Sequence, residues 1–550
     1  MNAADELSDY YAELIEGTYN CVDRVVLNAY FPLGQSGGGF RTWWRQLRGG
    51  DAELDDAHLR EMAGTFARRL RAYCEKEKIV FIDAGTNERK HELAAAHLPS
   101  DPMFRGLFAV IAGMAPAPVW EVRHSPQGKI VELRHRPVWP YVKHYFFHLI
   151  DPHWGHVTVR MCGYPPFGAQ VILNGHEWVE RAARREEIRV VKCGNCFVEG
   201  SALMQIDRLA QSLRRATVIG RIERLCEQWL YSACLCFALT REEQQRSGFR
   251  YQYSIFQLEL SRNLVFWRGT QMAEVYQKLI DRTRSSLDLE RLKTLFGFKH
   301  RPHHKLKPGR RGPEVALIVE QSDYDLTVFK VQWGYFTLKL YDKGGRVLRA
   351  EVVVHNAKAL RSGKVLQKVP ELLDRMEEML VRFLNTVQAA HVSFLEEPAF
   401  DRWTEPTQRG HRRLAGVDLN KARNRNVVTA VVALASKPDG FTVGELAQQV
   451  QDRTGKRQYT ARNAAYDLAK LRGKDLVVKN DHGRRYRVDP KGLRGLCAYV
   501  VLRDKVIRPM LAGVVKGPGR PPKIVHPVDE HYVNLRAEML RTFATLGIAA

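Results

Sequence analysis

The chain has 550 residues, of which 45% are hydrophobic, and this much apolar material supplies several cores and excludes a disordered chain. Its 85 Lys and Arg outnumber its 61 Asp and Glu and give a net charge of +24, which favours nucleic acid as a partner over plain solubility charge. No run of about 18 apolar residues occurs, so no membrane partner is expected. With nine Cys and an acidic N-terminus that lacks an apolar signal core, we expect a cytoplasmic protein.

The first predicted elements form a βαβ-type α/β domain over residues 1–110. Residues 23–31 and 78–83 have strand character, and residues 54–76 carry apolar side chains at helical spacing. Strand, helix and strand in this order are typical of a βαβ unit.

A glycine-rich turn at residues 34–39 precedes a segment of basic and aromatic residues. Arg41 and Arg45 flank Trp43 and Trp44 there, a combination that binds single-stranded nucleic acid by charge and stacking. The alternative is a plain turn followed by buried tryptophans.

A central β-rich α+β region is predicted over residues 111–298. Its strands are expected at residues 119–122, 130–133, 143–150, 156–161 and 251–260, and its helices near residues 175–187, 202–245 and 272–285.

A basic linker is predicted next, because residues 299–313 hold six Lys or Arg and no acid among His, Pro and Gly. Residues 314–400 form a β-hairpin region and a helical connector. The hairpin strands are expected at residues 337–341 and 346–355, and the connector at residues 369–394.

Two glutamates stand in the middle of apolar strands, Glu259 in the central region and Glu351 in the hairpin. A carboxylate in such a strand is costly unless it is paired or binds a metal, so these two could hold a divalent ion, Mg²⁺ or Mn²⁺. The alternative is a salt-bridged sheet in which Glu351 pairs with Lys339 across the hairpin. Zinc is not expected, because Cys193 and Cys196 form a single CxxC with no second pair at zinc-site spacing.

Residues 416–490 predict a winged helix, a DNA-binding arrangement of three helices and a β-hairpin. A first helix is expected at residues 424–435, and Thr442 with Glu445 forms a capping box for the second. The third helix is expected at residues 461–471 and the hairpin strands at residues 476–479 and 485–488.

The third helix of such a module lies in the major groove of DNA. Arg462, Asn463 and Lys470 are placed on its outer face as readers of bases or phosphates, and the hairpin residues Arg484, Arg485 and Arg487 are expected to contact phosphates. The alternative is a winged helix that binds another protein. Residues 401–550 carry 29 Lys and Arg against 14 acids, which favours DNA.

A basic tail is predicted over residues 491–550. Its segment 516–523 resembles an AT-hook, a short Gly-Arg-Pro element that lies in the minor groove of A·T-rich DNA. The prolines keep the chain extended, and Arg520 would enter a narrow groove of high negative potential.

Two resemblances add to these predictions. Residues 338–343 and 348–351 resemble a segment of phage and plasmid rolling-circle replication initiators, in which a glutamate serves the metal site and a tyrosine attacks the DNA phosphate. The resemblance implies a metal role for Glu351 and makes Tyr276 the candidate nucleophile. Residues 27–44, 151–177 and 246–266 are similar to a bacterial mobile-element-like family with a C-terminal winged helix, for which no activity is established.

The sequence thus predicts a multidomain α/β and α+β protein of mobile-element type that binds DNA through its winged helix. It would be a metal-dependent DNA nickase or a replication or transposition initiator. Two alternatives are a non-enzymatic DNA-binding regulator and an RNA-binding or RNA-guided protein.

Overall fold

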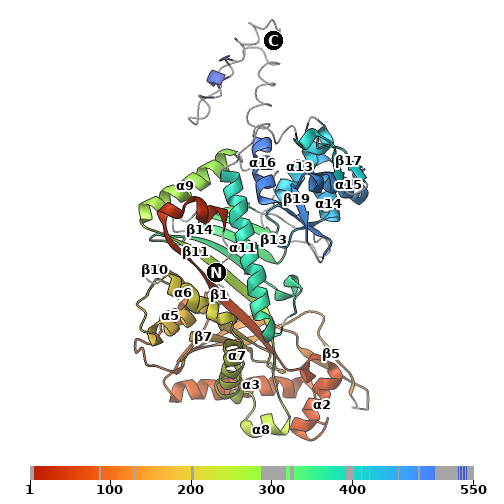
Figure 1. The fold of residues 1–550 in the computed structure, drawn as a ribbon. Helices are drawn as coiled ribbons and strands as arrows, with labels where there is room; N and C mark the ends of the chain where they lie inside the picture. Colours follow the sequence, from red (N-terminus) through yellow and green to blue (C-terminus); the bar gives the residue numbers. More distant parts are fainter. Residues whose placement is uncertain are drawn as a thin grey trace.

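An eleven-stranded sheet organises most of the chain in the computed structural model (Figure 1). The structure describes residues 5–501 except 86–87, 128–129, 200–202, 287–316, 322–326, 364, 392–401, 410–411, 420, 456–457 and 481–482, together with 531, 533–535, 537–538 and 541. The predicted linker at 299–313 and the AT-hook-like segment with Arg520 lie outside the described residues. No helix in the described part of the chain is both long and apolar enough to cross a membrane.

The sheet is mixed, because one of its strand pairs is parallel. Its strands are β1 (Ile15–Tyr30), β2 (Val80–Asp83), β3 (Gly106–Pro116), β6 (Tyr141–Asp151), β7 (Gly155–Cys162), β8 (Ala169–Leu173), β11 (Gln252–Phe266), β12 (Leu317–Gln321), β13 (Thr327–Trp333), β14 (Phe336–Asp342) and β15 (Val347–Val354). They run in the order β12-β13-β14-β15-β11-β1-β8-β7-β6-β3-β2. Neighbouring strands pair antiparallel except β2 and β3, which are parallel.

The prediction of a separate βαβ-type domain over residues 1–110 is wrong. β1 pairs with β11 and β8, and β2 pairs with β3, so the two predicted strands are not neighbours. A sheet that joins residues 15–30, 252–266 and 347–354 also crosses the boundaries predicted near residues 110 and 298. Strand pairing across more than 200 residues is a property of the whole chain, and local periodicity does not report it.

Helices cover the sheet and its ends. They are α1 (Glu6–Tyr10), α2 (Gly37–Arg48), α3 (Asp56–Lys76), α4 (Lys90–Ala95), α5 (Gly175–Arg185), α6 (Leu203–Gln211), α7 (Ala216–Ala233), α8 (Arg241–Arg246), α9 (Gly269–Ser286) and α11 (Val369–His391). In Figure 1, α11 lies along the sheet, and it packs on β11 and β15. Its leucines and methionines recur at helical spacing and are buried, as predicted for the connector at 369–394.

Small two-stranded sheets flank the large one. β4 (Trp120–His124) pairs with β5 (Ile130–His135), and β9 (Val191–Lys192) pairs with β10 (Phe197–Glu199). The loop between β9 and β10 reaches the large sheet near β1, where it contributes to the site described below.

The C-terminal module, residues 417–501, follows the sheet. It contains the helices α13 (Ala422–Leu434), α14 (Val443–Thr454), α15 (Ala461–Gly473) and α16 (Pro490–Val501) and the strands β18 (Phe441–Thr442), β19 (Val477–Lys479) and β20 (Arg485–Val488). β20 pairs with both β18 and β19 in a three-stranded sheet. Thr442 and Glu445 form the expected capping box at the start of α14, and α16 packs on α11 and α13.

Candidate functional site

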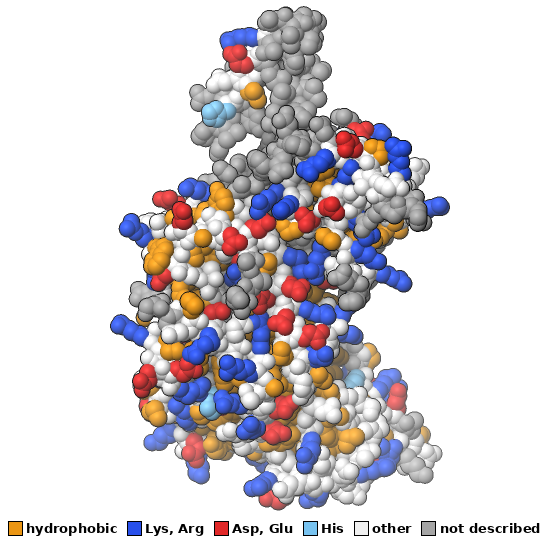
Figure 2. All heavy atoms as spheres, in the orientation of Figure 1, with side chains coloured by type: hydrophobic (Ala, Val, Ile, Leu, Met, Phe, Trp, Pro, Cys, Tyr) orange, Lys and Arg blue, Asp and Glu red, His pale blue; other side chains and the backbone are white. Residues whose placement is uncertain are grey.

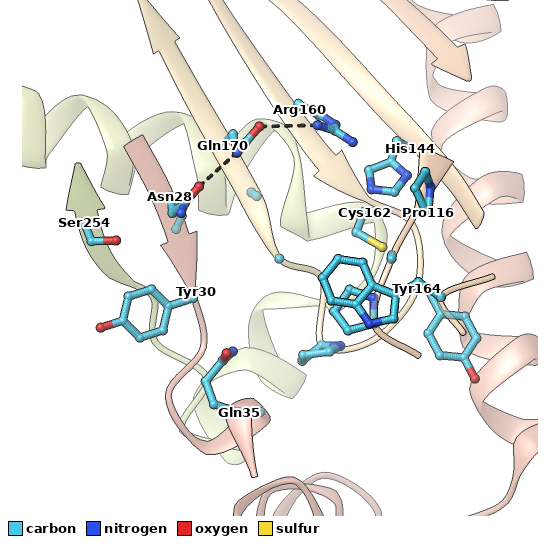
Figure 3. A pocket seen from close by; sticks show the side chains of 18 of the residues that line it. Asn28, Tyr30, Gln35, Pro116, His144, Arg160, Cys162, Tyr164, Gln170 and Ser254 are labelled. Carbon is cyan, nitrogen blue, oxygen red and sulfur yellow. Dashed lines mark hydrogen bonds between the residues drawn. The ribbon is translucent and has the colours of Figure 1, made fainter. Parts of the chain in front are cut away.

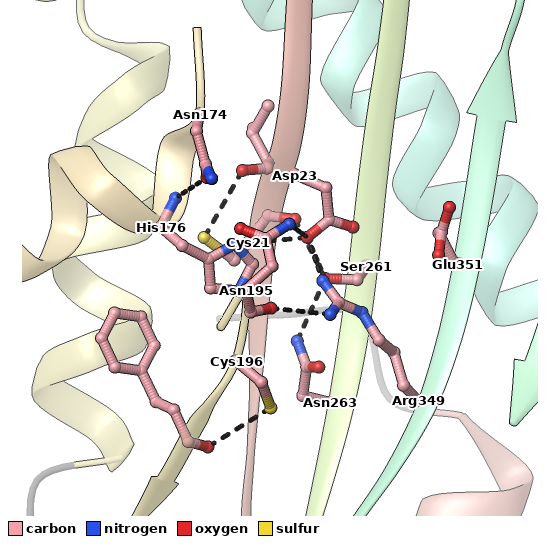
Figure 4. A network of polar contacts seen from close by, with 12 residues as sticks. Cys21, Asp23, Asn174, His176, Asn195, Cys196, Ser261, Asn263, Arg349 and Glu351 are labelled. Carbon is pink, nitrogen blue, oxygen red and sulfur yellow. Dashed lines mark hydrogen bonds and ion pairs between the residues drawn. The ribbon is translucent and has the colours of Figure 1, made fainter. Parts of the chain in front are cut away.

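Glu259 and Glu351 lie on one face of the large sheet. The register pairs Glu351 with Ser261 of β11, two residues from Glu259, so the two glutamates are diagonal neighbours. A β-bulge between Val22 and Arg24 brings Asp23 to the same neighbourhood (Figure 4), and Arg24 pairs in register with Glu259. Strand register therefore gathers three carboxylates on β1, β11 and β15.

Lysine and arginine side chains offset most of the negative charge of this cluster, and a tyrosine hydroxyl adds a hydrogen bond. The Lys339 ammonium lies 2.9 Å from one oxygen of Glu351, and the Tyr341 hydroxyl donates to the other oxygen at 2.8 Å. Arg24 reaches Glu259 at 3.9 Å. The Lys339–Glu351 pair is the cross-hairpin salt bridge that the sequence offered as the alternative to a metal site.

Asp23 is the centre of a buried network (Figure 4). It forms an ion pair with Arg349, accepts a hydrogen bond from Ser261 at 3.1 Å and lies 3.2 Å from His176 Nδ1. Arg349 also donates to Ser261 and, at 2.7 Å, to the backbone carbonyl of Asn195 in the β9–β10 loop. The network ties β1, β11, β15, α5 and this loop together.

Burial controls the pKa values in the cluster. It raises the pKa of the Asp23 carboxyl to about 7, since the Arg349 guanidinium offsets only part of the lost hydration. Burial also raises the pKa of Glu259, and the carboxylate of Glu351 adds to this rise. For Glu351 burial opposes ionisation, but Lys339 and Arg349 together lower its pKa. Glu259, with 18% of its side chain exposed, is the acid that opens to solvent.

The candidate nucleophile Tyr276 is a buried residue of a helix. Tyr276 lies on α9 with 7% of its surface exposed, and the tyrosine that bonds Glu351 is Tyr341. The described residues contain no group of three or more His, Cys, Asp or Glu placed to hold a metal ion. The metal role of Glu259 and Glu351 and the nucleophilic role of Tyr276 therefore stay predictions.

The sequence analysis missed the residues at the centre of this network. Asp23 and Arg349 are charged residues within apolar strands, the same signal that identified Glu259 and Glu351. That signal could have found them. His176 stands at the start of α5, and only the fold shows that it meets Asp23.

The glycine-rich segment at residues 34–39 leads into α2, which carries Arg41, Trp43, Trp44 and Arg45. Trp43 and Trp44 are fully buried, so they cannot stack on bases, and Arg41 and Arg45 both form ion pairs with Asp51 at 2.5 and 2.6 Å. A Cβ at Gly37 would lie 2.3 Å from the Leu133 carbonyl oxygen. Gly37 therefore allows close packing, and Gly37–Gly39 form the first turn of α2 instead of a plain turn. The buried tryptophans of the alternative are confirmed.

The three predicted contact residues of α15 in the C-terminal module differ in exposure and in hydrogen-bond partners. Arg462 is exposed. Asn463 accepts a hydrogen bond from the backbone N–H of Thr460 at 3.0 Å and caps the helix. Lys470 is 7% exposed and bonds Asn424 at 2.9 Å and Asp467 at 3.1 Å, so its placement on the outer face is wrong.

The hairpin shows the same division. Arg484 is exposed. Arg485 donates to the Gly440 carbonyl at 2.8 Å and lies 3.1 Å from Asp439, and Arg487 lies 3.4 Å from Glu378 of α11. Two of the three predicted phosphate contacts therefore already have acidic partners. Figure 2 likewise shows Lys and Arg spread over this face of the molecule with acidic side chains among them.

A cavity of about 700 Å³ lies on the polar side of the sheet, beside β1, β7, β8 and β11 (Figure 3). Arg160 and Gln170 approach each other at 3.5 Å, and Gln170 donates to Asn28 at 3.0 Å, which makes a polar row across three strands. His144 and the exposed Trp139 also line the cavity. Buried and half-buried residues alternate along β7, and Arg160 and Cys162 belong to the half-buried set that lines the cavity.

Three comparisons set the chain beside known proteins. No protein-family model, no curated protein and no solved structure matches it. The resemblances noted from the sequence therefore stay predictions, and the function must be inferred from the residues and contacts of this chain.

Proposed function

We propose that the chain binds duplex DNA and that the C-terminal module does so as a winged helix, with α15 in the major groove and the β19–β20 hairpin against the backbone. The order of three helices and a hairpin, with β18 completing a three-stranded sheet, supports this assignment. The observation that carries the proposal is the exposed face of α15. It presents Arg462, Ala465 and Tyr466 to solvent, with Arg484 and Lys479 exposed on the hairpin.

The side chains of that face suit contact with a groove. Ala465 is small enough to let the helix axis approach the bases, and Arg462 in the first turn can reach guanine O6 and N7 with two hydrogen bonds. Lys479 and Arg484 can neutralise phosphates. Lys470 takes no part in this contact, because it is buried against Asp467. The cap engages the side-chain oxygen of Asn463, and a base contact by its amide group stays a prediction.

The experiment is a fluorescence anisotropy titration of the full chain with a duplex selected from a random pool. Arg462→Ala should weaken binding to the selected duplex by about 1–3 kcal/mol and weaken binding to random duplex much less. Arg69→Ala is the matched control, since Arg69 is an exposed helical arginine on α3, outside the module. Equal losses for the two variants, or tighter binding to single-stranded RNA than to any duplex, would contradict the proposal.

A second function, metal-dependent nicking by a mobile-element initiator, has one observation in its favour. The pKa of Glu259 is raised by burial and by the nearby Glu351 carboxylate, and a divalent cation between carboxylates would relieve that repulsion. Supercoiled plasmid incubated with the protein and Mg²⁺ or Mn²⁺ should then become nicked. Glu259→Gln should abolish nicking and Glu242→Gln, a change in an exposed helix, should leave it intact. Nicking that survives Glu259→Gln would exclude this site.

A further inference from the structure

We propose that a cavity between α5, α6 and the start of α7 binds a phosphate group. The cavity has a volume of about 380 Å³. Arg185 of α5, Arg208 of α6, and Arg215 and Arg221 at the start of α7 line it. No residue of the C-terminal module lines it, so the proposal is independent of DNA binding by that module.

Positive charge in this cavity exceeds negative charge. Glu186 is the one carboxylate among the described residues that line it, and Glu186 forms an ion pair with Arg208. Arg185, Arg215 and Arg221 also line the cavity and form no ion pair with Glu186, and Arg185 donates to His153 Nδ1 at 2.5 Å. An anion is therefore the ligand class that this lining favours.

The ring of Trp178 packs beneath Arg185 and Arg221. Trp178 is 3% exposed, and the guanidinium carbons of Arg185 and Arg221 lie 5.7 and 6.0 Å from its ring centre. The indole N–H of Trp178 donates to the Ser212 hydroxyl at 3.3 Å, which fixes the ring. Burial lowers the pKa of Arg185, and the neighbouring Arg221 adds to the fall. Like charges thus lie close together on a rigid surface, and a bound anion would relieve their repulsion.

The start of α7 adds a second source of positive potential. This 18-residue helix begins at Ala216, its N-cap residue Arg215 provides no side-chain hydrogen bond, and Thr217 also lines the cavity. Backbone N–H groups at a helix start favour anions, and one arginine can bind phosphate oxygens through two parallel hydrogen bonds. A phosphate group, either in a small molecule or at the end of a nucleic-acid strand, fits these donors better than a carboxylate, because it offers more oxygens.

The test is calorimetric titration of the full chain with inorganic pyrophosphate. Arg221→Gln should weaken binding on the order of tenfold or more, as expected when a charge-assisted contact is lost. Arg184→Gln is the matched control, because Arg184 lies beside Arg185 in α5, is 62% exposed and pairs with Glu180 outside the cavity. No detectable pyrophosphate binding at millimolar concentration, or equal losses for the two variants, would overturn the proposal.

Thermal unfolding separates ligand binding from a merely structural role. Without ligand, Arg221→Gln should keep or raise the melting temperature, because it removes a like charge, and it should lose the rise in melting temperature that pyrophosphate causes in the unaltered protein. A lower melting temperature of ligand-free Arg221→Gln, with the pyrophosphate effect retained, would overturn the proposal. Displacement of pyrophosphate by a 5′-phosphorylated oligonucleotide, but not by its 5′-hydroxyl counterpart, would identify a strand end as the source of the phosphate. Displacement by neither would identify a small phosphate compound.

Discussion

The two ends of α5 lie beside charged groups in different electrostatic states: a buried ion pair at the start and a set of arginines at the end. At the start of the helix, His176 lies beside Asp23, which is paired with the buried Arg349. At its end, Arg185 lies beside Arg221 over the ring of Trp178 with no acid of its own among the lining residues. The first arrangement uses charge to hold the fold together, and the second leaves charge available for a ligand.

The difference shows why a net charge of +24 says little about where a ligand binds. In the C-terminal module Arg485 is paired with Asp439, whereas Arg484 is exposed. Only the exposed cations can exchange water and counterions for phosphate without breaking an internal ion pair. Variants of Arg349, Arg462, Lys470 and the hairpin arginines test whether a charge is paired inside the protein or available to a ligand.

The largest effect is expected from breaking the Asp23–Arg349 pair. Asp23→Asn and Arg349→Met should each lower the free energy of unfolding by about 3–5 kcal/mol, because each leaves an uncompensated charge or polar group buried. Urea denaturation measures this. The double variant should lose much less than the sum of the single losses, since no charge is then left alone. Additive losses would mean that the two residues do not act as a pair.

A histidine pair should make the protein sensitive to acid. His148 is buried against His156 at 3.0 Å, and burial lowers the pKa of His148 to about 3, below the value of about 6.5 for an unfolded histidine. Between these two pKa values, His148 is therefore protonated in the unfolded chain and neutral in the folded protein. Stability is fully present above pH ~6.5 and is lost as pH falls towards 3, by roughly 2–3 kcal/mol at pH ~4.5 for this residue.

The measurement is the free energy of unfolding between pH 7 and pH 4.5 for His148→Gln and for His97→Gln, an exposed control. His148→Gln should flatten the pH dependence, and the control should leave it unchanged. An equally steep loss in His148→Gln would show that other groups cause the acid sensitivity.

A smaller and more selective effect is expected on α15. Arg462→Ala should weaken DNA binding by about 1–3 kcal/mol and leave the melting temperature unchanged, because Arg462 is exposed. Lys470→Met should lower the melting temperature and leave the DNA affinity of the folded protein nearly unchanged, since Lys470 is an internal partner of Asp467 and Asn424. If Lys470→Met lost DNA affinity and kept the melting temperature of the unaltered protein, Lys470 would be a DNA contact and not an internal partner.

Local patterns predicted much of the secondary structure. The hairpin at 336–354, the helix at 369–391, and α13, α14, α15, β19 and β20 of the C-terminal module follow from periodicity and turn residues in their own segments. The helix α16 and the strand β18 were not predicted, and the basic tail predicted from residue 491 begins within α16. The arrangement of the large sheet could not be predicted in this way, because β1 finds its partners about 145 and 240 residues away.

The candidate sites were less predictable than the secondary structure, because their side chains also meet partners from distant segments. Helical spacing placed Lys470 on the outer face, but its position depends on Asn424, which belongs to another helix. Likewise, a glutamate in an apolar strand needs a partner, but the strand alone does not say which residue that is. The strand register is what places Tyr341 and Lys339 beside Glu351. The cavity over Trp178 combines side chains from three helices, so no single segment carried its signal.

The salt dependence of duplex binding by the full chain tests most directly whether exposed cations of the C-terminal module contact DNA. Each phosphate contact contributes about 0.9 to the slope of log affinity against log salt concentration. We expect Arg484→Ala to reduce the slope by about one and Arg487→Ala, whose arginine is paired with Glu378, to leave it nearly unchanged. Salt-insensitive binding, or a slope that falls equally in both variants, would contradict the account.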